Sequence, residues 1–165
     1  RGSTEEAGMA SRIETALAAL GLTLPDAPAP RANYVPTVRT GALVFTAGQL
    51  PMLDGALTCV GRLGENVTLE AGQAAARVCA LNVLAHLRNA CDGDLDRVRR
   101  CVRVGGFVNS TPDFTDHPLV VNGASDLFVA VLGDAGRHAR TAVGVAALPR
   151  GVAVEIDAVF EIEIG

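Results

Sequence analysis

Residues 140–164 read RTAVGVAALPRGVAVEIDAVFEIEI, and the alternation inside this stretch decides the fold class. Apolar residues fill every second position of 152–164, which is the period of a β-strand with one buried face. The other face carries four carboxylates: Glu155, Asp157, Glu161 and Glu163. Residues 140–148 form a second β-rich run, and a Leu-Pro-Arg-Gly turn at 148–151 joins the two runs. We therefore expect two strands here, which lie side by side if the turn closes a hairpin.

Two long helical patterns precede these strands. In residues 69–91 apolar side chains recur at helical spacing behind Thr68, a suitable N-cap. The second pattern covers 118–132 and ends at Gly133. Between them, residues 97–108 alternate arginine with valine and cysteine, as a strand does. This order predicts an α+β sandwich, a mixed sheet with two long helices on one face.

A short helix and a hairpin occupy the N-terminal third. Ser11 and Glu14 have the spacing of a capping box, so a short helix should begin there. The proline-rich residues 24–33 cannot form regular structure. Two short β-rich runs within 34–48 meet at Thr40-Gly41 and indicate a hairpin.

The chain is expected to contain one domain that associates with copies of itself. Residues 1–23 comprise a tail, 1–8, followed by the short helix, and residues 24–165 form a single domain without repeats. The sheet face opposite the helices carries charges together with three valines: Val143, Val145 and Val159. A half-apolar outer face suggests packing against another subunit.

The composition excludes several chemistries. All 14 basic residues are arginine, so a lysine Schiff base, a pyridoxal phosphate aldimine and a P-loop lysine are impossible. The net charge of -4 opposes binding of nucleic acid through its phosphates. The arginines of 97–108 could still form a nucleic-acid strip, but a solvated outer face is the favoured interpretation. No apolar run reaches 18 residues and no signal peptide opens the chain, so we expect a cytoplasmic location away from membranes.

The four cysteines are expected to be reduced core thiols. Cys59, Cys79, Cys91 and Cys101 contain no CxxC pair, and only three histidines are available to complete a metal site. Structural zinc sites usually need two close ligand pairs. No metal site is therefore expected.

Arg140 and Glu155 form the candidate site. Arg140 opens one C-terminal run and Glu155 lies on the next, so a hairpin would place both near one rim of the sheet. An arginine can hold a ligand carboxylate, and a nearby carboxylate can orient water or relay a proton. The alternative, which spacing alone favours, is an ordinary cross-strand ion pair.

The chain resembles the RidA/YjgF family, also known as reactive intermediate deaminases and, historically, as L-PSP endoribonucleases. The resemblance rests on Tyr34-Val35, LVFTAGQLP (43–51), VVNGASDLF (120–128) and ARTAVGVAALPRGVAVEIDAV (139–159), and covers about residues 30–163. It implies a chorismate-mutase-like sandwich and a homotrimer with sites in the clefts between subunits. It also implies hydrolysis of enamines and imines from amino acids to 2-keto acids and ammonia, without metal or cofactor.

The same resemblance implies roles for individual residues. Arg140 would bind the substrate carboxylate, and Glu155 would position the attacking water. The substrate-binding positions would be Tyr34, Ala47, Gly48, Asn122 and Ala142. Two of these depart from the family pattern, because Ala47 replaces a serine and Ala142 replaces a cysteine.

Three functions follow from these features. The leading one is the imine or enamine deaminase. The second is a trimeric protein that binds a 2-keto acid or similar metabolite and has lost turnover, which the two alanines suggest. The third, an endoribonuclease, is disfavoured by the acidic charge, the absent lysines and the lack of a histidine pair.

Overall fold

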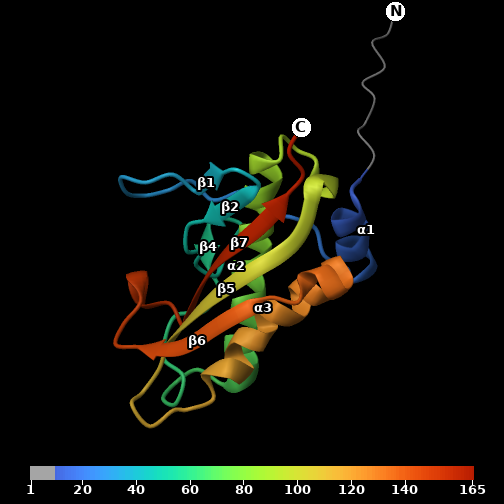
Figure 1. Cartoon of the computed structure of the whole chain (residues 1–165). Helices are drawn as coiled ribbons and strands as arrows, with labels where there is room; N and C mark the ends of the chain where they lie inside the picture. Colours follow the sequence, from blue (N-terminus) through green and yellow to red (C-terminus); the bar gives the residue numbers. More distant parts are fainter. Residues whose placement is uncertain (1–9) are drawn as a thin grey trace, which may run out of the picture.

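The computed structural model describes residues 10–165, so the tail expected at 1–8 lies outside the described part. A five-stranded mixed sheet in the order β1-β2-β7-β5-β6 carries the helices on one face, and β3 pairs separately with β4 (Figure 1). The strands are β1 Thr37–Thr40, β2 Leu43–Thr46, β3 Met52–Leu53, β4 Ala56–Leu57, β5 Val98–Asn109, β6 Ala139–Val145 and β7 Val154–Ile162. The α-helices are α1 Arg12–Ala19, α2 Leu69–Ala90 and α3 His117–Leu132, with short 3-10 turns η1 Leu95–Arg97, η2 Gly133–Gly136 and η3 Pro149–Gly151. The predicted α+β arrangement of a mixed sheet and helices is confirmed.

The alternation that decides the fold is present in β7, the central strand. Every even-numbered residue of β7 is buried and every odd-numbered one is half-buried. The strand is shorter than the predicted 152–164, because Val152 instead pairs with Val60 in an isolated bridge. The even positions therefore build the core under the helices, and the odd positions, including Glu155, face away from them.

The two C-terminal strands do not form a hairpin, because β5 lies between them. The chain passes from β5 to β6 through α3, and a strand reached by a crossover helix runs parallel to its predecessor. Accordingly β6 pairs with β5 in parallel, and β7 pairs antiparallel with the other edge of β5. Val104 is thus opposite both Arg140 and Ala158. The η3 turn connects β6 to β7 past the end of β5, where Asn109 donates to the Val152 carbonyl at 3.2 Å.

The N-terminal hairpin and its turn are confirmed. β1 and β2 pair from Thr37 opposite Thr46 to Thr40 opposite Leu43. The two central residues of the turn are Gly41 and Ala42, one position beyond the predicted centre at Thr40-Gly41.

The long helices are confirmed within two residues of their predicted bounds. The Thr68 hydroxyl caps α2 by accepting a hydrogen bond from the Ala71 N–H at 3.1 Å. The two helices approach closely at Gly123, where a Cβ would collide with the carbonyl of Gln73. Residues 117–136 are long and apolar enough to cross a membrane by length and composition. Phe128 and its apolar neighbours in α3 are buried in the core, however, which is the environment of a core helix.

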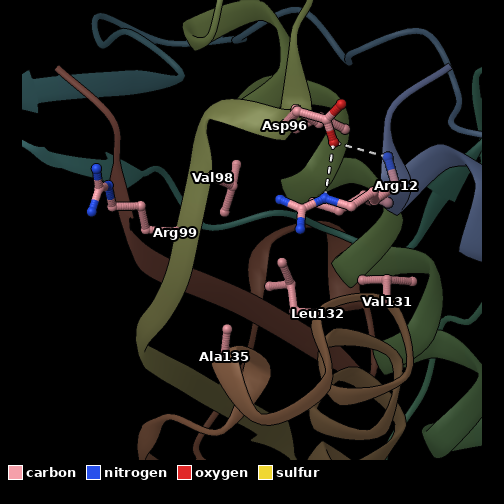
Figure 2. A pocket seen from close by; sticks show the side chains of 9 residues that line it. Arg12, Asp96, Val98, Arg99, Val131, Leu132 and Ala135 are labelled. Carbon is pink, nitrogen blue, oxygen red and sulfur yellow. Dashed lines mark hydrogen bonds and ion pairs between the residues drawn. The ribbon is translucent and has the colours of Figure 1, made fainter. Parts of the chain in front are cut away.

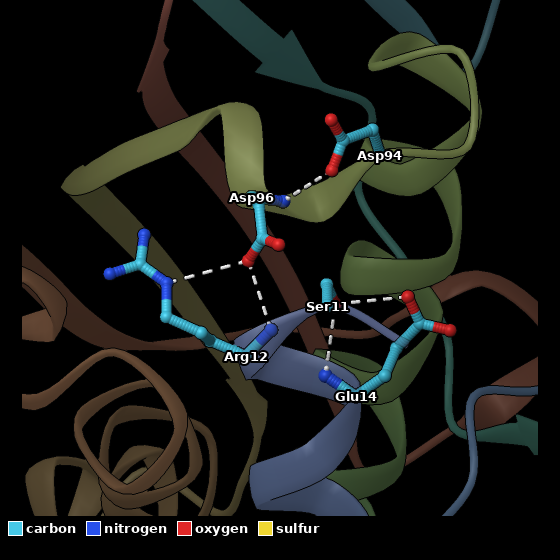
Figure 3. A network of polar contacts seen from close by, with 5 residues as sticks. All are labelled: Ser11, Arg12, Glu14, Asp94 and Asp96. Carbon is cyan, nitrogen blue, oxygen red and sulfur yellow. Dashed lines mark hydrogen bonds and ion pairs between the residues drawn. The ribbon is translucent and has the colours of Figure 1, made fainter. Parts of the chain in front are cut away.

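The short helix α1 is docked on the domain. The Ser11 oxygen accepts from the Glu14 N–H at 3.1 Å, as predicted, while its hydroxyl donates to the Glu14 carboxylate at 2.9 Å (Figure 3). Asp96 accepts from the backbone N–H and the Nε of Arg12 at 2.9 and 3.4 Å. A hollow of about 210 Å³ beside this pair is walled mainly by aliphatic side chains (Figure 2). Ile13 is buried in the common core, so α1 is part of the packed structure.

The cysteines are free thiols, as predicted. Three are buried, and Cys59 is half-buried. Burial raises the pKa of Cys101 to about 12, so this thiol is protonated at neutral pH. Across residues 10–165, no group of three or more His, Cys, Asp or Glu side chains could hold a metal ion.

The outer sheet face is half-apolar, as predicted. Val143 is 39% exposed, and Val145 and Val159 are half-buried. Two further apolar side chains, Val38 and Phe45, are 55% and 43% exposed on the hairpin. Exposed apolar side chains gathered on one sheet face are typical of an interaction surface.

Candidate functional site

A hollow of about 420 Å³ lies beside the segment that follows β2 and beside the first residues of β7. Three of the residues singled out from the sequence line it: Tyr34, Gly48 and Glu155. The proline-rich residues 28–32, Leu50, Met52 and the turn residues 149–150 complete most of the wall. The hollow is therefore mostly apolar, with one carboxylate from the sheet.

The backbone holds Glu155 against Gly48. Gln49 and Ile156 exchange two hydrogen bonds, Gln49 N–H to Ile156 carbonyl at 2.8 Å and the reverse at 3.1 Å. These bonds fix Gly48 beside the outward-facing Glu155. A Cβ at Gly48 would lie 2.9 Å from both Cδ and Oε2 of Glu155. Only glycine leaves room for the carboxylate in this position.

The pKa of Glu155 is raised, first by burial and second by the negative charge of Asp157. Asp157 lies two residues further along β7, on the same face. Burial also raises the pKa of Asp157. A hydrogen bond from the Gly105 backbone and the positive charge of Arg103 lower this pKa, but by less than burial raises it. Glu155 therefore keeps a proton to a higher pH than an exposed glutamate, which suits a group that exchanges protons with a substrate.

Ala47 lies next to this hollow but does not line it. Its N–H donates to the Pro36 carbonyl at 2.8 Å, and its carbonyl accepts from Gln49 Nε2 at 3.3 Å. The backbone of Ala47 thus ties the segment after β2 to the start of β1.

Arg140 lies in a second cluster, between β6 and α3. Its Nη1 donates to Asn122 Oδ1 at 2.7 Å and to Ser125 Oγ at 3.2 Å, and its Nη2 donates to the Pro118 carbonyl at 3.4 Å. No carboxylate of residues 10–165 pairs with Arg140. Its guanidinium is therefore positioned by neutral groups, and its positive charge has no carboxylate partner among the described residues.

Ser125 is itself held by His138. The hydroxyl of Ser125 lies 2.8 Å from His138 Nε2, and His138 Nδ1 lies 2.6 Å from the Gly136 carbonyl. Burial lowers the pKa of His138, and the positive charge of Arg140 lowers it further. The hydrogen bond to the Gly136 carbonyl raises this pKa, but the net shift is downward. A neutral ring that donates from Nδ1 accepts at Nε2. The hydroxyl of Ser125 then donates to His138 and accepts from Arg140.

The two clusters are not joined within one chain. Arg140 is in register with Val104 and Ala158, whose side chains are buried under the helices, so Arg140 lies on the helix-facing side. Glu155 is on the opposite face of the sheet, two strands away. The hairpin that would have brought the pair to one rim is absent, and the cross-strand ion pair is absent with it. Ala142 follows Arg140 on the helix-facing side and packs against the core.

Six polar side chains of these clusters were not singled out from the sequence. Ser125 and His138 are 13 residues apart in different elements, so no pattern joins them to Arg140. The hollow beside Glu155 is also lined by four of them: Arg31, Gln49, His86 and Arg150. A signal existed for His86, because it interrupts the apolar stripe of the longest predicted helix.

The mixed sheet, its helical layer and the two clusters define a protein of the YjgF/chorismate mutase-like class. The model of the family described as "YjgF/chorismate mutase-like, putative endoribonuclease" matches residues 14–156. The chain belongs to this family, as the sequence resemblance predicts.

Individual relatives cover nearly the whole chain. It is 51% identical to Protein TCP17 of Trypanosoma cruzi over 92% of this chain and 94% of that protein. It is 32% identical to the 2-iminobutanoate/2-iminopropanoate deaminase of Salmonella typhimurium over 81% of this chain and 91% of the deaminase.

Solved structures agree with the fold. The crystal structure of Atu1372 of Agrobacterium tumefaciens, a protein of unknown function, superposes with a TM-score of 0.87 at 48% identity and covers 92% of this chain and 93% of its own. E. coli TdcF, solved with bound serine, gives a TM-score of 0.57 at 26% identity over 84% of this chain and 93% of its own.

Proposed function

We propose that the protein hydrolyses 2-imino acids and their enamine tautomers to 2-keto acids and ammonia. The observation that carries this proposal is the Glu155 carboxylate, held over Gly48 in an apolar hollow with a raised pKa. The similarity to the Salmonella deaminase, which covers 81% of this chain, supports it.

The reaction needs little from the protein beyond orientation and proton transfer. Water adds to the imine carbon, its oxygen forms the new C–O bond, and one of its protons passes to Glu155. Glu155 returns this proton to the nitrogen, which gives a carbinolamine. Glu155 then moves the hydroxyl proton to the amino nitrogen, the C–N bond breaks, and ammonia leaves as the carbonyl forms. The imine carbon is already electrophilic, so holding it beside the water and Glu155 supplies much of the rate increase.

We further propose that the site is completed between subunits of a homotrimer. Glu155 and Arg140 face opposite sides of the sheet in one chain, so one substrate cannot touch both within a single subunit. The half-apolar outer face gives a surface on which another copy could pack. In this arrangement Arg140 of a neighbouring subunit binds the substrate carboxylate, and the neutral cluster around it leaves its charge unpaired for that purpose.

We also propose a cytoplasmic location, because the reduced thiols fit that setting.

A second candidate is a small-metabolite binding or regulatory protein without turnover. Ala47 and Ala142 favour it, because they remove a hydroxyl and a thiol from positions where the family has them. An endoribonuclease has no such observation in its favour.

A semicarbazide competition assay tests the proposal. An amino-acid oxidase generates the imine in place, and semicarbazide traps whatever imine the protein does not hydrolyse. We expect the wild type to suppress semicarbazone formation and Arg140→Ala to lose that effect. Saturable binding of 2-keto acids without suppression of any imine would favour the binding protein.

A further inference from the structure

His138 is linked to Arg140 through the hydroxyl of Ser125. The His138 ring is half-buried between η2 and β6 and lies edge-on to Phe128, with ring centroids 6.2 Å apart. Its Nδ1 lies 2.6 Å from the Gly136 carbonyl, and its Nε2 lies 2.8 Å from Ser125 Oγ. Ser125 Oγ lies in turn 3.2 Å from Arg140 Nη1. The contacts therefore form one hydrogen-bonded chain that runs from a backbone carbonyl to the guanidinium.

The Gly136 carbonyl determines the direction of every hydrogen bond in this chain. A carbonyl oxygen can only accept, so Nδ1 of His138 carries a proton. In the neutral ring Nε2 is then an acceptor, and the Ser125 hydroxyl donates to it. The hydroxyl proton is thus directed away from Arg140, and a lone pair of the oxygen is left for the N–H of Nη1.

Protonation of the His138 ring would reverse the middle bond of the chain. Nε2 would become a donor, and the Ser125 hydroxyl would have to accept from both neighbours. Two positive charges, on His138 and Arg140, would then share one hydroxyl and repel each other. The orientation of the guanidinium therefore depends on a neutral ring.

The surroundings of His138 favour the neutral ring. Burial lowers its pKa first, and the positive charge of Arg140 lowers it further. None of the other charged residues on the adjoining segments contributes to this shift: Asp126 on α3, Asp134 in η2, Arg137 and, on β5, Arg103. Asp134 and Arg137 pair with each other at 3.6 Å.

On the basis of the proposed function, we infer that His138 is a positioning residue for Arg140. It fixes the Ser125 hydroxyl so that the guanidinium keeps the orientation in which the carboxylate of a 2-imino acid or 2-keto acid binds. His138 touches no reacting atom in this role. Its effect is therefore on the affinity for the carboxylate, and that affinity falls when the ring is protonated.

Two variants separate this role from a structural one. His138→Gln can place an amide oxygen near Nε2 and keep an acceptor for Ser125, whereas His138→Asn can place an N–H near Nδ1 and keep the bond to Gly136. We expect the Kd of 2-oxobutanoate, measured by calorimetry at pH 7, to rise about three- to tenfold in His138→Asn. His138→Gln should restore it to within about twofold of wild type. In a Ser125→Ala background His138→Asn should cause no further rise, because His138 acts through Ser125.

A second histidine supplies the control. His117 makes the same kind of contact with a serine, 3.1 Å to Ser110, away from Arg140. His117→Asn should therefore leave the Kd of 2-oxobutanoate within about twofold of wild type. An equal rise in His117→Asn and His138→Asn would overturn the inference.

The pH dependence of binding tests the inference on the unaltered protein. The Kd of the wild type should rise as pH falls through the lowered pKa of His138, and that of His138→Gln should not. Protonation of Glu155 cannot produce this rise, because removing a negative charge from the site would tighten the binding of an anion. A wild-type Kd that stays constant or falls in this range would overturn the inference.

Side-chain NMR of Arg140 separates failure of this inference from failure of the proposed function. Rotation about the Cζ–Nη bonds of Arg140, with resonances assigned by their loss in Arg140→Ala, should be slower in wild type and His138→Gln than in His138→Asn. This result would support the inference even if no imine is hydrolysed. Equal rotation in all three proteins, or a Kd that rises in His138→Gln and not in His138→Asn, would overturn it and leave His138 as a structural support of η2.

Discussion

The carboxylate of Glu155 lies so close to the backbone of Gly48 that a Cβ at Gly48 would stand 2.9 Å from Oε2. The hydrogen bonds between Gln49 and Ile156 hold the two residues in this relation. Because Gly48 has no side chain, the Glu155 carboxylate can occupy this position in the hollow.

Gly48→Ala should displace the Glu155 carboxylate from the hollow. A shift of about 1 Å in a reacting group typically costs about 100-fold in rate, so we expect a loss of that order in kcat/KM for imine hydrolysis. A thermal melt serves as the control, because the displaced side chain can move toward solvent and the melting temperature should change little. Unchanged kcat/KM in a folded variant would show that the contact is unimportant.

Ser125→Ala should weaken substrate binding through Arg140. The change removes a hydrogen bond of 3.2 Å to Nη1 and leaves the guanidinium less well oriented. We expect KM to rise about three- to tenfold with kcat nearly unchanged. Ser110→Ala is the matched control, because it removes a similar serine–histidine contact, 3.1 Å to His117, away from Arg140. Equal effects of the two variants on KM would argue against a positioning role for Ser125.

The pH profile of hydrolysis should depend on Asp157. Activity that needs ionised Glu155 rises as pH increases through the raised pKa of that residue. Asp157→Asn removes the neighbouring negative charge, which is the second cause of the shift, so the pKa of Glu155 should fall. The acid limb of kcat/KM against pH should therefore move to lower pH. A limb that stays in place would mean that another group controls it.

Glu155 should also make stability depend on pH. Because its folded-state pKa is raised, its contribution to stability is fully present below the unfolded pKa of about 4.3 and is lost as pH rises through the folded pKa. Glu155→Gln cannot ionise and avoids this loss. The melting temperature of the variant, relative to wild type, should therefore increase from about pH 4 to pH 7. A constant difference across that range would contradict the raised pKa.

Local patterns predicted the local structure of this chain. The Ser11–Glu14 spacing located α1, and the alternation of 152–164 identified β7 and its buried face. Pairing was not predictable in the same way, because nothing in the turn at 148–151 shows that β5 separates β6 from β7. The crossover through α3 fixes that order, and it is a property of the whole sheet.

The candidate site likewise has one part that the sequence predicts and one part that depends on strand pairing. The residues near Glu155 could be named from the sequence, since Gly48 and Tyr34 belong to strings of the family resemblance. Their meeting with Arg140 could not, because the side on which Arg140 lies follows from its register with Val104. His86 was overlooked because a histidine in an apolar helical stripe is most often a core residue.

The central claim is that Arg140 of one subunit and Glu155 of another act on the same substrate. Complementation tests it most directly, with Arg140→Ala and Glu155→Gln chains carrying different tags and co-expressed in equal amounts. Each variant alone should be inactive in the imine assay. Mixed trimers should recover about a third of the wild-type activity, because in a cyclic trimer of two chains of one kind and one of the other only one of the three sites joins an intact Arg140 to an intact Glu155. Mixed assemblies isolated through both tags that show no activity above either parent would contradict the claim.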